Sequence, residues 1–230
     1  MSPIRAYQGK QPRLAANAWI DPTALVIGDV EIGAGSSIWP MAVIRGDVHY
    51  IRIGAETNIQ DGSILHVSHD SRFLPGGAPL IIHDRVTIGH QVVLHGCEIH
   101  DCCLIGIGAR ILDRAVVQPR TLLGAGSLVP PRQVLEGGYL WLGSPVTRIR
   151  PLTDEELEAI LVVGQLGEER VKQGRDMLCH EVVLIAICIP LARVREQIGL
   201  QAEIARGWRE LAEDHDRLAR VEAVGGGVTL

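Results

Sequence analysis

The chain has 230 residues, which is enough for one domain, or one domain with an appendage, that buries a substantial core. Its formal net charge of -5 and the lack of a basic stripe argue against a nucleic-acid-binding protein. Apolar residues make up 47% of the chain but aromatic residues only 3%, so Val, Ile, Leu and Ala must fill a narrow, regularly layered interior.

The cysteines form neither an even disulfide framework nor a C-x-x-C zinc pattern, which indicates reduced thiols. The N-terminal segment lacks the apolar core of a signal peptide. The longest apolar run, residues 182–192, is too short to span a bilayer and contains Pro190. We therefore expect a soluble, cytoplasmic protein with no membrane partner.

Residues 1–22 are predicted to be a lead-in segment, because three prolines prevent long regular structure there. From Val26 onward an aliphatic residue recurs at every sixth position and is often followed by Gly or a small or polar residue. This period predicts a hexapeptide β-helix, in which short strands form flat faces, three hexapeptides complete a coil, and the aliphatic side chain points inward. A β-sandwich would instead show period-two strands separated by regular turns. The series comprises Val26, Ile32, Ile38, Ile44, Ile53, Ile59, Leu65, Ile82, Ile88, Leu94, Ile99, Ile105, Ile111, Val117, Leu123 and Val129.

The period is interrupted in three places. Three extra residues predict a small loop over 48–52, and a longer insertion over 67–79, rich in Gly and Pro, predicts a protruding loop. One residue is missing from the repeat that follows His95, and the longer insertion begins directly after His66. Because loops on a rigid scaffold often carry function, both histidines become candidate site residues.

The repeats end at the Pro130-Pro131 pair, and residues 139–145 are predicted to return over the last coil. The segment Thr153-Asp-Glu-Glu156 matches a capping box, which predicts that a helix begins there.

Two further helical segments are predicted, over 181–198 and over 201–221, and Pro190 should kink or split the first. The chain is thus expected to divide into a β-helix domain over 1–150 and a helical C-terminal extension over 151–230.

Three histidines are candidate metal ligands: His66, His90 and His95. His66 and His95 each follow the inward aliphatic residue of their hexapeptide, so they can lie on one face in different coils. His90 stands two places after Ile88, in a different position, and is not expected to meet the other two within one chain. A neighbouring subunit of a cyclic trimer could present it across an interface. Three neutral imidazoles with one open coordination position are typical of a catalytic zinc site.

Short motifs within the repeats strengthen this interpretation: Arg45-Gly-Asp47, Asn58-Ile-Gln-Asp-Gly62, His66, Gly89-His90 and Leu94-His-Gly-Cys97. Together with the hexapeptide pattern, they resemble the gamma-class carbonic anhydrase-like family over residues 10–160. The resemblance implies a left-handed parallel β-helix, a homotrimer, and a divalent metal at each subunit interface that is bound by His66 and His95 of one chain and His90 of the next. Zinc is the expected ion, with iron(II) or cobalt as alternatives, and the implied reaction is the reversible hydration of CO2 to bicarbonate.

The resemblance also implies roles for four other residues. Gln60 would orient the attacking hydroxide, and Arg45, Asp47 and Asp61 would form a charged network between subunits. For those three, a purely structural role in holding the trimer together is an equally good interpretation.

Two glutamates of active family members have no counterpart, because Val48 stands at the first place and the loop over 67–79 contains no Glu. His69 or Asp70 could instead carry protons away from the metal. Two other functions therefore stay open: an acyltransferase of the hexapeptide class with a histidine as general base, and a non-catalytic metal-binding or scaffolding trimer.

Overall fold

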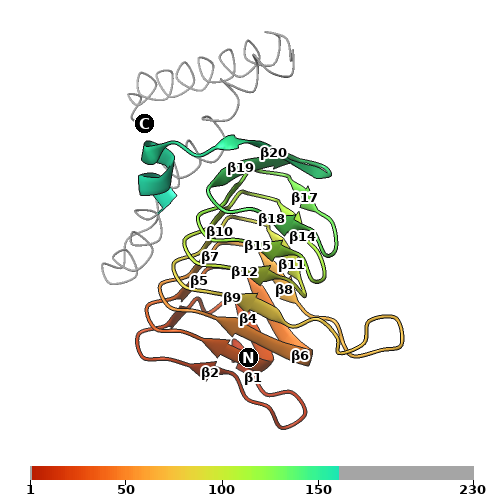
Figure 1. The fold of residues 1–230 in the computed structure, drawn as a ribbon. Coiled ribbons are helices and arrows are strands. Elements are labelled where there is room, and N and C mark those ends of the chain that lie inside the picture. The colour runs from red at the N-terminus through yellow and green to blue at the C-terminus, as the bar shows by residue number, and fades with distance from the viewer. Residues whose placement is uncertain (1, 161–230) are drawn as a thin grey trace, which may run out of the picture. The chain divides into compact units, whose positions relative to one another are not determined.

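The structure, a computed structural model, describes residues 2–160. Short parallel strands stack coil upon coil, as Figure 1 shows, and the predicted β-helix of hexapeptide coils is confirmed. A 12-stranded sheet contains β1 (Ile4–Arg5), β2 (Arg13–Leu14), β4 (Leu25–Ile32), β6 (Val43–Ile53), β8 (Ile64–His66), β9 (Leu80–Ile82), β11 (Val93–His95), β12 (Glu98–Ile99), β14 (Arg110–Ile111), β15 (Val116–Val117), β17 (Leu128–Val129) and β18 (Val134–Leu135). An 8-stranded sheet contains β3 (Trp19–Ile20), β5 (Ser37–Ile38), β7 (Asn58–Ile59), β10 (Thr87–Ile88), β13 (Leu104–Ile105), β16 (Leu122–Leu123), β19 (Tyr139–Gly143) and β20 (Val146–Pro151).

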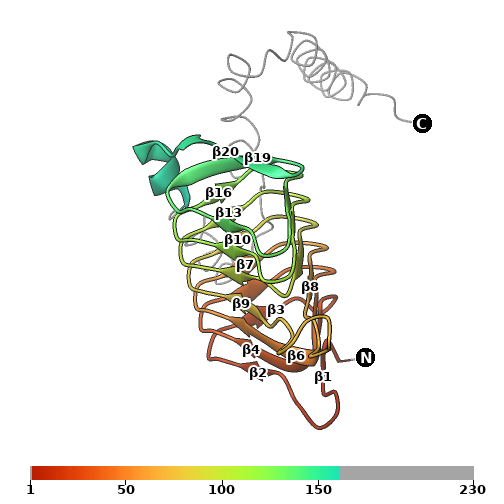
Figure 2. The ribbon, with the colours of Figure 1, turned by 45° about the vertical axis from the view of Figure 1, so that its right-hand side comes forward.

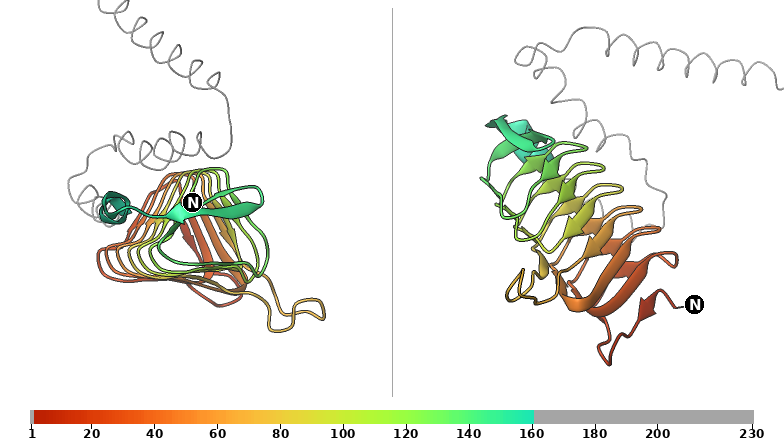
Figure 3. Two further views of the ribbon diagram at one scale, coloured as in Figure 1. Left: turned by 45° about the horizontal axis from the view of Figure 1, so that its top comes forward. Right: turned by 90° about the vertical axis from the view of Figure 1, so that its right-hand side faces the viewer.

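The coils have a triangular outline when viewed along the stack (Figure 3, left). The long strand β6 turns a corner, because its first residues pair with β8 and its last residues pair with β9. The 12-stranded sheet therefore supplies two of the three faces. We call the face of β8, β11, β14 and β17 the first face and that of β9, β12, β15 and β18 the second. The 8-stranded sheet is the third face.

The inward aliphatic residues form the core, as the period predicts. All members of the series from Val26 to Val129 are at most 4% exposed. They stack on their counterparts in neighbouring coils; on the third face, for example, Ile59, Ile88 and Ile105 are paired in register. Each buried side chain of this kind stabilises the fold by about 1.5–3 kcal/mol relative to exposure, so the stacked columns fix the register of the coils.

The interruptions of the period take two different forms. The prediction of a loop over 48–52 is wrong, because these residues stay within β6. Gly28 lies opposite Gly46 and Val30 opposite Ile51, so residues 47–50 bulge where β4 has the single residue Asp29. A bulge absorbs the extra residues without breaking the ladder on either side.

The insertion over 67–79 does form the predicted loop, which projects from the corner between β8 and β9 (Figures 1 and 3). It is closed by bridges between Ser68 and Ala78 and between Ser71 and Leu74. Since the loop starts directly after His66, it leaves the scaffold beside that side chain.

The C-terminal part of the described chain begins with the predicted return, because β19 pairs with β16 and then antiparallel with β20. A helix follows over 154–160, next to β20 in Figure 2. Its capping box is confirmed: the Thr153 backbone N–H donates to Glu156 Oε2 at 2.9 Å, and the Glu156 N–H donates to Thr153 Oγ1 at 3.3 Å. Within residues 2–160, no helix has the length and apolarity that a membrane crossing requires.

The helices predicted over 181–198 and 201–221 lie outside the described residues. The division into domains over 1–150 and 151–230 therefore stays a prediction.

Candidate metal centre

His66 and His95 lie side by side at the end of the first face. They are the last residues of β8 and β11, and they are register partners in adjacent coils. Their rings turn toward each other, with His66 Nδ1 and His95 Nε2 only 3.1 Å apart. The stacking of Leu65 on Leu94, one residue earlier, brings the two side chains together.

Each of these histidines also contacts a carboxylate through its other nitrogen. His66 Nε2 lies 2.9 Å from Asp47 Oδ1, and His95 Nδ1 lies 2.8 Å from Asp113 Oδ1. An ionised carboxylate only accepts hydrogen bonds, so each outer nitrogen must be the donor. In the neutral imidazole the remaining nitrogen then carries a lone pair. The two inner nitrogens therefore face each other as two acceptors.

Two lone pairs at 3.1 Å repel each other unless a cation lies between them. A proton on His66 Nδ1 is disfavoured, because burial above all, and also Arg45 and His95, lower the pKa of His66 despite the hydrogen bond to Asp47. Tetrahedral zinc ligands at about 2.0–2.1 Å from the ion lie about 3.3 Å from one another. The pair therefore fits two ligand positions of a divalent metal, with the carboxylates fixing tautomer and ring orientation.

Arg45 and Asp47 complete this corner. The Arg45 guanidinium forms an ion pair with Asp47 Oδ2, while Asp47 Oδ1 receives His66. Burial alone would raise the pKa of Asp47, but the hydrogen bonds from His66 and Arg45 outweigh it and lower this pKa. Asp47 is therefore an ionised acceptor, which is the state that holds His66 as described.

His90 lies at a different corner, just after β10 on the third face. Its Nδ1 is 3.0 Å from Asp61 Oδ2, and the Gln91 N–H donates to the Asp61 carbonyl. Gln60 lies next to Asp61; it is 2% exposed, and its Nε2 has no hydrogen-bond partner. This corner therefore gathers a histidine, a carboxylate and an unused buried amide donor.

Within one chain the structure does not bring His90 to His66 and His95. Strand β11, which alone spans roughly 10 Å, lies between His90 and the end of the first face. Among the described residues, one group of three His, Cys, Asp or Glu side chains has its ligand atoms within 4.8 Å of one another, and that group is His83, Glu98 and His100. The ligation of one ion by all three predicted histidines therefore stays a prediction that depends on a second subunit.

Asp113 is the site residue that the sequence interpretation missed. Besides holding His95, its carboxylate accepts a hydrogen bond from the Ser68 hydroxyl at the base of the projecting loop. A signal was available: Leu94 and Ile111 are register partners, so Asp113 stands in the next coil, one place after the residue opposite His95.

The proton-export groups around the pair are sparse. Val48 stands at the place where the family resemblance implies a glutamate, and it is 45% exposed. Asp70 Oδ1 already accepts the Gly76 N–H at 2.7 Å and so helps to shape the loop. His69 is exposed and stays a candidate for carrying protons away from the site.

Two buried cysteines, Cys97 and Cys103, are unsuited to nucleophilic or ligand chemistry. Burial raises the pKa of Cys97, and it raises the pKa of Cys103 to about 12. Because the thiolate is the reactive form, both residues are inert core side chains at neutral pH.

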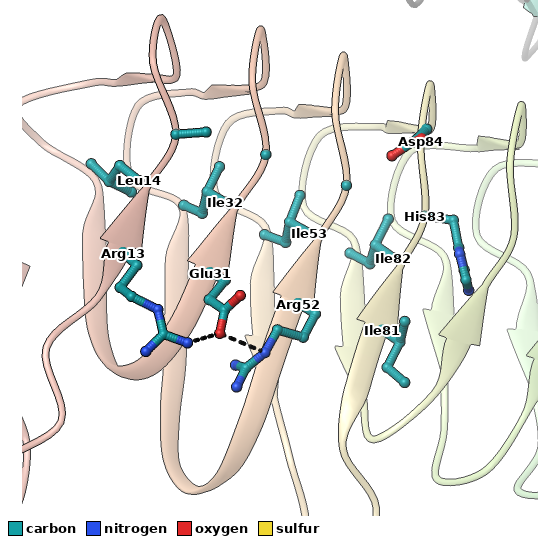
Figure 4. A pocket seen from close by; sticks show the side chains of 13 residues that line it. Arg13, Leu14, Glu31, Ile32, Arg52, Ile53, Ile81, Ile82, His83 and Asp84 are labelled. Atoms are coloured by element: carbon teal, nitrogen blue, oxygen red, sulfur yellow. Dashed lines mark hydrogen bonds and ion pairs between the residues drawn. The ribbon is translucent and has the colours of Figure 1, made fainter.

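A groove of about 520 Å³ lies elsewhere, along the edge of the second face. Figure 4 shows its lining, in which Glu31 bridges Arg13 and Arg52 and His83 stands at the far end. The groove contains none of the predicted metal ligands. The candidate metal centre is therefore defined by the His66–His95 pair and not by this groove.

Comparisons with known proteins support the same fold. The family described as bacterial transferase hexapeptide (six repeats) matches residues 12–46. Protein YrdA of Escherichia coli (strain K12) is 54% identical over 153 residues, covering 66% of this chain and 83% of that protein. Gamma carbonic anhydrase 2, mitochondrial, of Arabidopsis thaliana is 44% identical over 210 residues, covering 91% of this chain and 70% of that protein. The crystal structure of a hexapeptide transferase family protein from Anaplasma phagocytophilum matches with a TM-score of 0.68 and 33% identity over 75% of this chain and 98% of that chain.

Proposed function

Because the chain belongs to the gamma-class carbonic anhydrase-like family of hexapeptide-repeat proteins, we propose that it catalyses the metal-dependent, reversible hydration of CO2 to bicarbonate. The observation that carries the proposal is the pair of imidazole nitrogens of His66 and His95, which face each other as acceptors at 3.1 Å. Zinc suits such ligands best, with iron(II) or cobalt as alternatives.

The proposal includes a homotrimer in which His90 of a neighbouring subunit supplies the third ligand. Two observations support it: His66 and His95 share one corner of the prism, and His90 lies at another. Because Gln60 and Asp61 share the corner of His90, they would enter the site together with it. The cyclic arrangement repeats the same contact three times and closes on itself.

The metal would lower the pKa of a bound water to about 7 and so supply hydroxide at neutral pH. The residues of this chain would do the rest. Gln60, whose buried Nε2 lacks an acceptor, would donate a hydrogen bond that orients the attacking oxygen toward CO2. Asp47 and Asp113 would hold the two imidazoles in their ligating tautomers.

Turnover is expected to be slow for a carbonic anhydrase, because each cycle must export a proton from the site. The loop over 67–79 offers the exposed His69 in place of a glutamate. A cytoplasmic location is also part of the proposal, since reduced thiols fit that compartment.

An acyltransferase activity is the second candidate, favoured by the hexapeptide transferase names of the matching family and of the Anaplasma phagocytophilum protein. A non-catalytic metal-binding scaffold is the third, favoured by the missing glutamates. Acetyl-CoA turnover that survives complete metal removal would support the transferase.

The test of the main proposal combines metal analysis with stopped-flow CO2 hydration. The purified full-length protein is assayed after chelation and again after anaerobic reconstitution with zinc or iron(II). We expect one ion per chain and hydration above background only in the reconstituted protein. One bound ion per chain without CO2 hydration would overturn the proposed enzymatic activity and leave the non-catalytic metal-binding scaffold.

A further inference from the structure

A second cluster of ligand side chains lies on the second face, away from the metal centre described above. His83 directly follows β9, Glu98 begins β12, and His100 directly follows β12. Glu98 Oε1 lies 3.1 Å from His83 Nε2 and 3.5 Å from His100 Nε2. The ligand atoms of all three lie within 4.8 Å of one another.

The β-helix itself brings the three side chains together. Strands β9 and β12 are register partners, with Ile82 stacked on Ile99, so His83 and His100 occupy the same place in adjacent coils. Both positions are held by backbone hydrogen bonds, from the His83 N–H to the Ile99 carbonyl at 2.8 Å and from the His100 N–H to the Val117 carbonyl at 2.9 Å. The two rings stack with centroids 4.7 Å apart and planes within 7°. Their Nε2 atoms therefore face the same carboxylate oxygen. An ionised carboxylate only accepts hydrogen bonds, so a metal that binds here would replace the protons on these nitrogens.

The charge of the cluster favours a cation. Within residues 2–160, the ion-pair partners of Glu98 are these two histidines, which are neutral unless protonated. The nearest basic residue on the outer side of the same ladder is Arg52, and Ile81 lies between Arg52 and Glu98 in the pairing order. Figure 4 shows Arg52 bound to Glu31, with Ile81 on the next strand. Among residues 2–160, Glu98 therefore contributes a negative charge that no arginine or lysine pairs with.

The geometry points to a second divalent metal site, formed by His83, Glu98 and His100 within a single chain. Two imidazoles and one carboxylate are a donor set for zinc and related transition metals. The distances of 3.1 and 3.5 Å from Glu98 Oε1 bracket the spacing of about 3.3 Å between tetrahedral zinc ligands. The three side chains are 34–39% exposed, so water or a partner's ligand can complete the coordination.

This site is independent of the intersubunit centre in two respects. It needs no second subunit, and it lies at the corner where the second face meets the third, whereas His66 and His95 lie where the first face meets the second. An ion bound here would tie two consecutive coils together directly after the projecting loop, and it would stabilise the folded chain by mass action.

The experiment uses the full-length protein, freed of metal by chelation and titrated with Zn2+ by calorimetry, with bound zinc counted after gel filtration. In His83→Ala and Glu98→Gln, one class of zinc sites should disappear or weaken by at least about tenfold, because each substitution removes one ligand. Zinc should also raise the Tm of the wild type more than that of either variant. Glu158→Gln, which changes an exposed glutamate elsewhere, is the matched control for Glu98→Gln and should behave like the wild type.

The result that would overturn the site is equal zinc stoichiometry, affinity and Tm shift in the wild type, His83→Ala and Glu98→Gln. The same titration in His66→Ala separates this site from the proposed catalytic centre. The class that depends on His83 should persist there, whether or not the protein hydrates CO2.

Discussion

At the scale of single residues, the proposed function depends on how two imidazoles are oriented. A histidine has two nitrogens, and the one that is held by a carboxylate leaves the other free to bind an ion. Asp47 and Asp113 perform this selection for His66 and His95. Asp113 reaches His95 from the next coil, so we infer that an aspartate outside the proposed ligand set controls metal binding.

We expect Asp113→Asn to weaken metal affinity by about 10- to 100-fold without unfolding the protein. An asparagine can offer its NH2 group to His95 Nδ1, which would leave the proton on the nitrogen that must bind the ion. Chelator-competition titration measures the loss. Asp154→Asn, at an exposed position on the helix over 154–160, is the control. Equal affinities in both variants would contradict the role of Asp113.

At the scale of elements, the helix over 154–160 shows how a short segment is held on the coils. Ile160 packs against Leu104, Leu122 and Leu140 of the third face. Glu156 is buried and accepts two hydrogen bonds from the Arg150 guanidinium, both at 2.7 Å. This hydrogen-bonded pairing raises the pKa of Arg150, so its guanidinium stays charged.

Removing the Thr153 cap alone should lower the free energy of unfolding less than removing Glu156, which serves both the cap and the ion pair. Thr153→Ala loses one capping hydrogen bond and should lower the free energy of unfolding by about 1 kcal/mol. Glu156→Ala loses the cap and also leaves the largely buried Arg150 unpaired, so we expect about 2–4 kcal/mol. Urea unfolding at one fixed protein concentration measures both, with Glu158→Ala as the exposed control. Equal losses for the two substitutions would show that the ion pair contributes nothing.

At the scale of the whole molecule, the β-helix is a rigid spacer that keeps two groups of site residues apart. One corner carries Asp47, His66 and His95, and the other carries Asp61 and His90. The strands between the corners are paired from coil to coil, which holds the two groups apart. The proposed activity therefore depends on assembly, and losing the trimer should lose the metal.

Mixing two inactive variants tests this directly. His66→Ala and His90→Ala should each form trimers that lack the intersubunit metal. When the two are unfolded together and refolded, every mixed trimer should contain one interface with all three histidines, and metal binding and hydration should partly return. Each variant refolded alone is the control. No recovery in proven mixed trimers would contradict a site shared between subunits.

The sequence alone determined the coil. Its period of six places Ile59, Ile88 and Ile105 in one buried column, because an inward aliphatic residue must stack on its counterpart in the next coil. The same register set His66 beside His95 and set His90 apart from them. It also marked the projecting loop and the capping box, which are encoded by residues close together in the chain.

Only the tertiary structure decided which side chains meet across coils. Asp47 and Asp113 approach the two histidines from neighbouring coils, and the bulge in β6 replaces an expected loop. The cluster of His83, Glu98 and His100 also exists only because two coils lie in register. The physical reason is that the course of the backbone is fixed by the inward aliphatic side chains, which make the same contact in every coil. The outward side chains differ from coil to coil. Their contacts therefore depend on which residue the adjacent coil brings beside them.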